Sequence, residues 1–242
     1  MQDGRIRLHL DHPLCPGQRV PLDADQAHYL FAVMRLGAGA GLLVFNAQDG
    51  EHAAQVAETG RRGGALICGA QTRPPLPPPD LWLLFAPLKK ARTDFVVEKA
   101  TELGCARILP VQTDHTNAER IRQDRLQAHA REAAEQCGAT HIPQVADLAP
   151  LDRVLAGWPA DRRILWADES RAGAPAVLGA AGRGAPWAVL IGPEGGFSDR
   201  ERARLAAHTA VVPVSLGPRI LRAETAALAA LVLWQAHLGD WT

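Results

Sequence analysis

Residues 187–198 read WAVLIGPEGGFS, and this stretch decides the fold of the carboxyl-terminal half of the chain. Its apolar run 187–191 is typical of a strand that is buried on both faces. The glycine-rich residues that follow predict a loop, and Ser198 and Glu201 have the spacing of a capping box, which predicts that a helix begins here. We therefore expect a strand-to-helix turn at the carboxyl end of a strand, where open α/β sheets bind their ligands.

The composition of this loop limits the ligand that it could bind. Its glycines permit positive φ angles and a close approach of the backbone to a ligand. The loop lacks the lysine and hydroxyl of a Walker A motif and the GxGxxG spacing of a dinucleotide-binding fold. It carries Glu194 instead, and a fixed carboxylate would repel a triphosphate but suit ribose hydroxyls or a cationic centre. The loop favours a sulfonium nucleoside over ATP, although a five-residue match taken alone is more often a tight turn.

A second unit of the same plan follows. A strand is expected at residues 211–216, then the loop GPRILR at 217–222, then a helix from about 224 to 238. Arg219, Arg222, Glu224 and Thr225 form a denser set of donors with a carboxylate than a connecting turn requires. The two arginines could equally form surface salt bridges. Two such loops can frame one ligand.

The rest of this half alternates strands and helices. Apolar runs predict further strands at residues 81–86, 106–111 and 163–167. Helical spacing predicts a helix from Asp94 to Leu103 that Gly104 ends, and a more polar helix is expected from about 124 to 136, ended by Gly138. This alternation predicts an α/β fold with a mostly parallel sheet and helices on both faces.

The clearest boundary in the chain is the run RPPLPPP at residues 73–79. Consecutive prolines lack amide donors and favour an extended, semi-rigid spacer. The sequence therefore predicts a Pro-rich linker at 74–79 between a first domain, residues 1–73, and a second, residues 80–242.

The first domain carries short stretches that are typical of strands, at residues 5–10, 42–45, 52–56 and 66–68. Asp49-Gly50 is a good hairpin turn. Asp23 can cap a short helix, which is expected to end at Gly37. We interpret this domain as a small β-barrel with one helix.

Composition excludes several classes of protein. The chain has 242 residues, of which 47% are hydrophobic, so it can bury a real core and is neither disordered nor fibrous. It has no secretory signal pattern and no apolar run of roughly 18 residues, so we expect a cytoplasmic protein without a membrane partner. Twenty-six basic and 26 acidic residues cancel, which counts against promiscuous nucleic-acid binding but permits a local basic face.

No metal site is expected. The four cysteines lie far apart without a CxxC pair, and we expect reduced thiols; they are Cys15, Cys68, Cys105 and Cys137. His9, Asp11 and His12 have no further ligand group at a plausible spacing, so ordinary strand and turn residues are the simpler interpretation.

Two sets of basic residues could contact a phosphate-bearing partner. Lys89, Lys90 and Arg92 follow the first strand of the second domain, and Lys99 lies farther along the same helix. Solvated helix charges are the usual explanation for such a run. The basic residues of the first domain are Arg5, Arg7, Arg35, Arg61 and Arg62, and the sequence leaves open whether they share a face.

The expected last helix is apolar nearly all round, since residues 226–234 read AALAALVLW. More than one of its faces must be covered. A second subunit or core packing within one chain could cover them, and periodicity does not separate the two.

Both glycine loops closely resemble those of the RsmE family of methyltransferases, in the SPOUT superfamily. The resemblance rests on LIGPEGGFS at 190–198 and LGPRILRAETA at 216–226. It extends through Lys89, Arg92, EKATELG at 98–104 and EAAEQC at 132–137, and more loosely through residues 28–36. One departure is that Ala139-Thr140-His141 stand where the family often has an arginine.

The resemblance implies a trefoil-knotted α/β methyltransferase domain preceded by a PUA-like β-barrel. It further implies a homodimer, S-adenosylmethionine as the cofactor, and methylation of uridine N3 in 16S ribosomal RNA of the small subunit. Another RNA or base as substrate and a non-catalytic RNA-binding homologue are the alternatives. A nucleotide-using α/β enzyme is disfavoured because the loops carry no phosphate-binding lysine.

The resemblance and the loop chemistry together predict three sets of site residues. The catalytic pair is Arg222 and Glu224, with Glu224 as proton acceptor and Arg222 stabilising charge on the uracil oxygens. Pre-ionised uridine held by arginine alone is equally compatible. The expected cofactor contacts are Glu169, Leu190, Gly192, Pro193, Glu194, Gly195, Gly196, Leu216, Gly217, Ile220, Leu221, Thr225 and Ala226. The expected RNA contacts are Arg5, Arg7, Arg35, Lys89, Lys90 and Arg92.

Overall fold

The computed structural model of the protein describes residues 6–117, 120–171 and 184–241. The chain forms two compact units, and each is described by itself. The first unit is Met1–Pro77 with Ala134–His141, and the second is Pro78–Ala133 with Ile142–Thr242. The domain boundaries expected from the sequence stay a prediction. Within the described ranges, no helix combines the length and apolar character that a membrane crossing requires.

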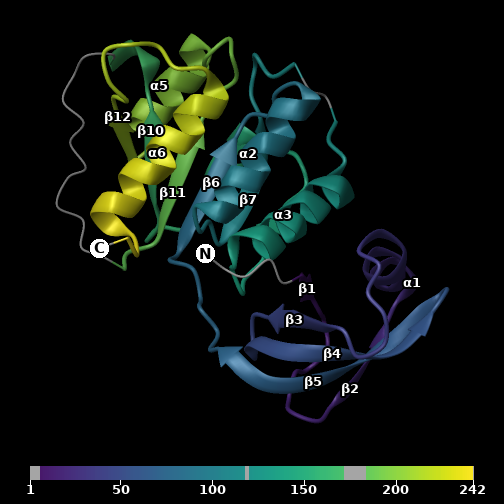
Figure 1. The fold of residues 1–242 in the computed structure, drawn as a ribbon. Coiled ribbons are helices and arrows are strands. Elements are labelled where there is room, and N and C mark those ends of the chain that lie inside the picture. Colours follow the sequence, from purple (N-terminus) through teal and green to yellow (C-terminus); the bar gives the residue numbers. More distant parts are fainter. Residues whose placement is uncertain (1–5, 118–119, 172–183, 242) are drawn as a thin grey trace. The chain divides into compact units, whose positions relative to one another are not determined.

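The second unit is built on a parallel sheet (Figure 1). Its strands are β6 (Leu81–Phe85), β7 (Arg107–Gln112), β8 (Gln144–Val145), β9 (Ala149–Pro150), β10 (Arg163–Ala167), β11 (Trp187–Ile191) and β12 (Val211–Val214). They are ordered β12-β10-β11-β6-β7-β8, with β9 beside β7. The pairings between them are parallel, as the sequence predicted.

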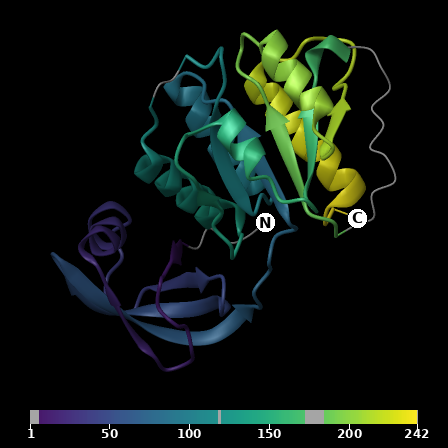
Figure 2. The ribbon, with the colours of Figure 1, turned by 180° about the vertical axis from the view of Figure 1, so that it is seen from behind.

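Helices cover both faces of this sheet, as Figures 1 and 2 show from opposite sides. They are α2 (Lys90–Glu102), α3 (Gln123–Cys137), α4 (Leu151–Ala156), α5 (Asp199–Ala207) and α6 (Ala223–Leu238), with a 3₁₀ turn η2 (Glu169–Arg171). On β11, Trp187, Val189 and Ile191 pack in the core layer of α2, α3 and α6. Ala188 and Leu190 pack in the layer of α4 and α5. Because successive side chains point to opposite faces, a strand covered on both sides is apolar throughout.

Two element boundaries in the second unit differ by more than one residue from those expected. α2 begins at Lys90 and not at Asp94, because its first turn is polar and lacks the apolar periodicity that signalled the helix. The Thr93 hydroxyl, which accepts from the amide of Leu88 and donates to its carbonyl, stabilises this turn. β12 ends at Val214, where the Ser215 hydroxyl accepts a hydrogen bond from the amide of Gly217. The capping box of Ser198 and Glu201 at the start of α5 is confirmed.

Residues 6–77 of the first unit form a five-stranded sheet and a helical segment. The elements are β1 (Arg7–His9), β2 (Arg19–Leu22), α1 (Ala24–Ala27), the π-helix η1 (His28–Val33), β3 (Gly41–Asn46), β4 (Gly50–Gly60) and β5 (Gly63–Arg73). Their order in the sheet is β1-β3-β4-β5-β2. The hairpin turn at Asp49-Gly50 is confirmed, with Asn46 paired to Gly50 and a φ of 78° at Gly50.

The helical segment begins as expected and ends earlier. Asp23 forms a capping box with Gln26. The expected end at Gly37 is wrong, because the helical turns stop at Met34 and Arg35 takes the left-handed φ of 58°. The amide of Leu36 then donates to the carbonyl of Leu30, and this bond closes the helix end behind the left-handed residue. Glycine usually takes this left-handed position, so Arg35 gave no signal in the sequence that the helix ends here.

Candidate functional site

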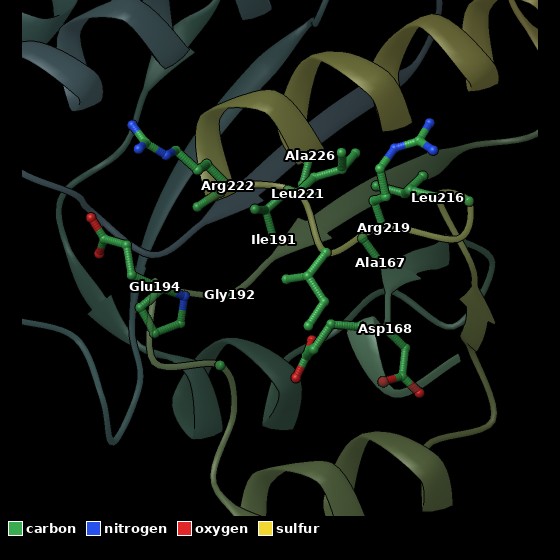
Figure 3. Close-up of a pocket in the computed structure, with 16 residues that line it drawn as sticks. Ala167, Asp168, Ile191, Gly192, Glu194, Leu216, Arg219, Leu221, Arg222 and Ala226 are labelled. Carbon is green, nitrogen blue, oxygen red and sulfur yellow. The ribbon is translucent and has the colours of Figure 1, made fainter. Parts of the chain in front are cut away.

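A cavity of about 270 Å³ lies at the carboxyl ends of β10, β11 and β12 (Figure 3). β10 stands between β11 and β12, so the chain leaves β11 and returns across β10 to form β12. A reversal of strand order of this kind opens a crevice at the carboxyl ends of the strands. The cavity is lined by Ala167, Asp168, Glu169, Ile191, Gly192, Pro193, Glu194, Gly196, Leu216, Gly217, Arg219, Ile220, Leu221, Arg222, Ala223 and Ala226.

Both glycine loops face this cavity. The predicted site residues that line it are Glu169, Gly192, Pro193, Glu194, Gly196, Leu216, Gly217, Ile220, Leu221, Arg222 and Ala226. In Figure 3, Glu194 and Arg222 lie at one end of the cavity, and Arg219 and Leu216 lie at the other. Two loops separated by a helix and a strand thus come together as the sequence suggested.

Four of the predicted catalytic and cofactor residues are not among those lining the cavity. Leu190 is fully buried and packs in the α4 and α5 layer, because alternation along β11 points it away from Ile191. Gly195 abuts His115, since a Cβ there would lie 3.2 Å from the His115 Cβ. Thr225 is exposed on α6. Glu224 stands at the start of α6, beside the cavity wall formed by Arg222 and Ala223.

Five lining residues were not assigned from the sequence: Ala167, Asp168, Ile191, Arg219 and Ala223. Asp168 and Ile191 could have been found from their place at the ends of β10 and β11, because the carboxyl ends of parallel strands meet at one edge. Arg219 stood out in the second loop without a role. Ala223 carries no signal beyond its position next to Arg222.

The first loop is packed so closely that two of its glycines are required. Gly196 has a φ of 68°, and a Cβ added there would lie 3.0 Å from Glu169 Oε1. A Cβ at Gly192 would lie 2.8 Å from the Phe197 ring. His115 Nδ1 lies 3.1 Å from the carbonyl oxygens of both Gly195 and Gly196. These contacts give the loop a fixed shape before any ligand binds.

Arg92 links two carboxylates beside the cavity. Its guanidinium lies 3.2 Å from Glu194 Oε1 and 3.5 Å from Glu224 Oε1. The Glu224 side chain is 16% exposed, and among the described residues its Oε2 atom is buried without a hydrogen-bond partner. A buried acceptor of this kind costs free energy until it finds a donor. Glu224 thus has one oxygen engaged by Arg92 and one available.

The residues predicted to bind RNA have different environments. Arg35, Lys89 and Lys90 are exposed, and Arg92 is half-buried between its two carboxylates. Arg5 lies outside the described residues.

The prediction that Arg7 contacts RNA is wrong. Its side chain is 3% exposed and donates to Glu51 Oε2 at 2.7 Å and to the carbonyls of Ala134 and Ala139 at 2.7 and 3.0 Å. Its guanidinium also lies 4.2 Å from the centre of the Phe45 ring. A buried guanidinium with its donors engaged is not free to meet a phosphate.

Known proteins resemble this chain over nearly its whole length. Residues 75–235 match a family model described as an RNA methyltransferase domain, and residues 22–66 match an RNA methyltransferase PUA domain. The ribosomal RNA small subunit methyltransferase E of Rickettsia conorii is 28% identical over 93% of both chains. The protein of the same name from Synechocystis is 31% identical over 90% of this chain and 73% of its own.

Two solved structures share the fold. Ribosomal RNA small subunit methyltransferase E of Neisseria gonorrhoeae, bound to S-adenosylmethionine, aligns with a TM-score of 0.87 at 26% identity, covering 98% of this chain and 100% of its own. A putative methyltransferase of Legionella pneumophila with S-adenosylmethionine bound aligns with a TM-score of 0.86 at 27% identity, covering 98% and 99%. The α/β fold with a PUA-like unit, expected from the motifs, is confirmed. The chain belongs to the RsmE family of RNA methyltransferases.

Proposed function

We propose that this protein transfers a methyl group from S-adenosylmethionine to N3 of a uridine in 16S ribosomal RNA of the small subunit. The observation that carries the proposal is the cavity framed by two glycine loops, with Arg222 on its wall and Glu224 beside it. The names of the curated relatives support ribosomal RNA as the substrate, and the bound ligand of the solved relatives supports the cofactor.

The residues of the cavity suit S-adenosylmethionine. The charged groups on its wall are Asp168, Glu169, Glu194, Arg219 and Arg222. Three carboxylates favour a ligand that carries a sulfonium and an amine over a polyphosphate. Bound there, S-adenosylmethionine supplies an activated methyl group. Calorimetry with S-adenosylmethionine, ATP and NAD tests this choice, and tighter binding of ATP would exclude it.

The chain's main task in an in-line displacement is to align the uridine with the methyl carbon. The N3 proton must also leave, and Glu224 Oε2 is a buried acceptor that a uridine N–H could satisfy. Arg92 holds the other oxygen of the same carboxylate. The exposed Arg222 guanidinium can stabilise the negative charge that develops on the uracil oxygens.

The target base must be unpaired or turned out of its stack to reach this site. The decisive experiment is reverse transcription of small-subunit RNA from cells with and without the protein, because a methyl on N3 blocks base pairing and stops the polymerase. We expect a stop at one uridine that disappears with the gene. An identical pattern of stops in both samples would exclude uridine N3 as the target.

RNA affinity should depend on salt much more than cofactor affinity does, because cations released from phosphates dominate RNA binding. Lys89→Ala and Lys90→Ala should each reduce the salt slope by about 1. The matched control is Lys99→Ala on the same helix, since Lys99 lies 2.7 Å from both Glu98 and Glu102. Filter binding across a salt series measures the slopes. Equal slopes in all three variants and the parent would contradict a phosphate contact at the start of α2.

We further propose that the protein is a homodimer joined through α6. One face of this helix carries Thr225, Ala229, Val232 and Ala236 at helical spacing, and Val232 is 39% exposed. A stripe of small and apolar residues can pack against its own copy across a two-fold axis, where both subunits contribute the same patch.

Val232→Asp should convert the dimer to a monomer, because it places a charge in the centre of an apolar contact. Sedimentation velocity at micromolar concentration measures the mass. Ala203→Asp, at an exposed position of α5, is the control and should leave the dimer intact. A parent protein that sediments as a single chain would exclude the dimer.

A further inference from the structure

An ionic cluster that joins α5 to the residues directly after β10 borders the cavity, and its arginine, Arg202, has no part in the mechanism given above. Arg202 of α5 donates to Asp168 Oδ1 at 2.6 Å and to Glu169 Oε1 at 2.8 Å. It also donates to the Ser170 hydroxyl at 2.6 Å, and that hydroxyl donates to Asp168 Oδ1 at 2.8 Å. Asp168 and Glu169 both line the cavity. One guanidinium therefore ties together two carboxylates of the cavity wall.

The surroundings of Arg202 give it a single geometry. Its side chain is 23% exposed, against 67% for Arg200 and 44% for Arg204 on the same helix. Burial alone would lower the pKa of Arg202, but hydrogen bonds and attraction from Asp168 and Glu169 raise it above the ordinary value. The planar guanidinium can bridge two carboxylates, which the single ammonium of a lysine cannot do equally well.

Arg202 also reaches the first glycine loop through two aromatic rings. Its guanidinium lies 5.4 Å from the centre of the Trp166 ring, and Trp166 packs edge-on against Phe197 at 6.0 Å. The Phe197 ring occupies the space that a Cβ at Gly192 would need. Glu169, which Arg202 holds, occupies the space of a Cβ at Gly196 in the same way. Arg202 therefore supports both the residues that line the cavity after β10, Asp168 and Glu169, and the glycine loop after β11.

We propose that Arg202 is a positioning residue for the cofactor cavity, which fixes Asp168 and Glu169 as acceptors for a hydrogen-bond donor of the cofactor. The inference rests on the proposed use of S-adenosylmethionine. The donors in question are the ribose hydroxyls or the amine of the methionine part. Without Arg202, two adjacent carboxylates would repel each other, and Glu169, which is 40% exposed, would turn to solvent.

The test compares Arg202→Met, Arg202→Lys and the control Arg204→Met by calorimetry. Arg204 lies on the same helix but pairs with Asp152, which is not among the residues lining the cavity. We expect Arg202→Met to weaken S-adenosylmethionine binding by about tenfold or more, as loss of charge-assisted hydrogen bonds does. Arg202→Lys should recover part of the loss, and Arg204→Met should bind as the parent does.

Steady-state kinetics separates positioning from a general loss of structure. Arg202→Met should raise KM for S-adenosylmethionine by the same factor as Kd, while kcat and KM for RNA change less than about threefold. Methylthioadenosine, which keeps the ribose and lacks the amine, identifies the donor: an equal loss of its affinity assigns the ribose, and no loss assigns the amine.

Two failures have separate meanings. A parent protein that does not bind S-adenosylmethionine would refute the proposed function. A parent that binds it, with Arg202→Met and Arg202→Lys variants of unchanged affinity and KM, would refute the role of Arg202 alone. If Arg202→Met does not fold, the affinity of Arg202→Lys for S-adenosylmethionine decides the question. Weaker binding than in the parent supports the role of Arg202, and unchanged binding refutes it.

Discussion

Replacing Glu224 with glutamine should slow single-turnover methyl transfer by about 100-fold to 10,000-fold, the range typical of a lost general base. Glutamine keeps the shape of the side chain and removes its ability to take the uridine N3 proton. S-adenosylmethionine affinity should change little, because Glu224 is not among the residues that line the cavity. Rapid-quench measurement with enzyme in excess over RNA isolates the chemical step from product release.

The pH dependence of the loss separates the two mechanisms left open by the sequence. If Glu224 takes the proton, the glutamine variant should recover towards the parental rate as rising pH ionises the uridine directly. If arginine alone holds pre-ionised uridine, Glu224→Gln should match the parent at every pH and Arg222→Ala should be slow at every pH. The control is Glu132→Gln, the same substitution at a carboxylate of α3 whose side chain is 74% exposed. A Glu224→Gln variant as fast as the parent at neutral pH would remove Glu224 from the mechanism.

The elements of the second unit were predictable because their signals are local. A strand covered on both faces needs apolar residues throughout, and Trp187–Ile191 satisfy this in five consecutive positions. The capping box at Ser198 depends on a residue three positions away. The position of the cavity was predictable too, because the carboxyl ends of two parallel strands meet at one edge of the sheet.

Partners far apart in the sequence could not be predicted in the same way. Arg202 meets carboxylates 34 and 33 positions away, and Arg92 meets Glu194 from 102 positions away. Arg7 was expected to contact RNA because a single arginine in a strand gives no sign of its partner. Its carboxylate is 44 positions away and its carbonyl partners are more than 120 positions away. Charge alone does not distinguish a buried cluster from a basic surface.

Replacing Arg7 with methionine should therefore change stability and not RNA recognition. The variant leaves Glu51, which is 3% exposed, with fewer donors in a buried site, and it frees the carbonyls of Ala134, Glu135 and Ala139. Breaking a buried ion pair by removing one partner typically costs about 3–5 kcal/mol. Urea unfolding followed by circular dichroism at pH 7 measures the free energy of unfolding. The control is Arg19→Met, whose exposed pair with Glu58 should contribute about 1 kcal/mol or less.

The ion pairs of Glu51 with Arg7 and Arg73 should also make the stability of the protein depend on pH. Burial would raise the pKa of Glu51, but hydrogen bonds from Arg73, Arg7 and Thr72 lower it from 4.5 to about 2. A carboxyl whose pKa is lower in the folded state stabilises the protein above its unfolded pKa, and that stabilisation is lost as the pH falls from 4.5 towards 2. In Arg7→Met one donor is gone, so the variant should lose less stability than the parent over this range. If the two proteins are equally stable at pH 7 and the variant binds RNA more weakly, Arg7 contacts RNA, as the sequence predicted.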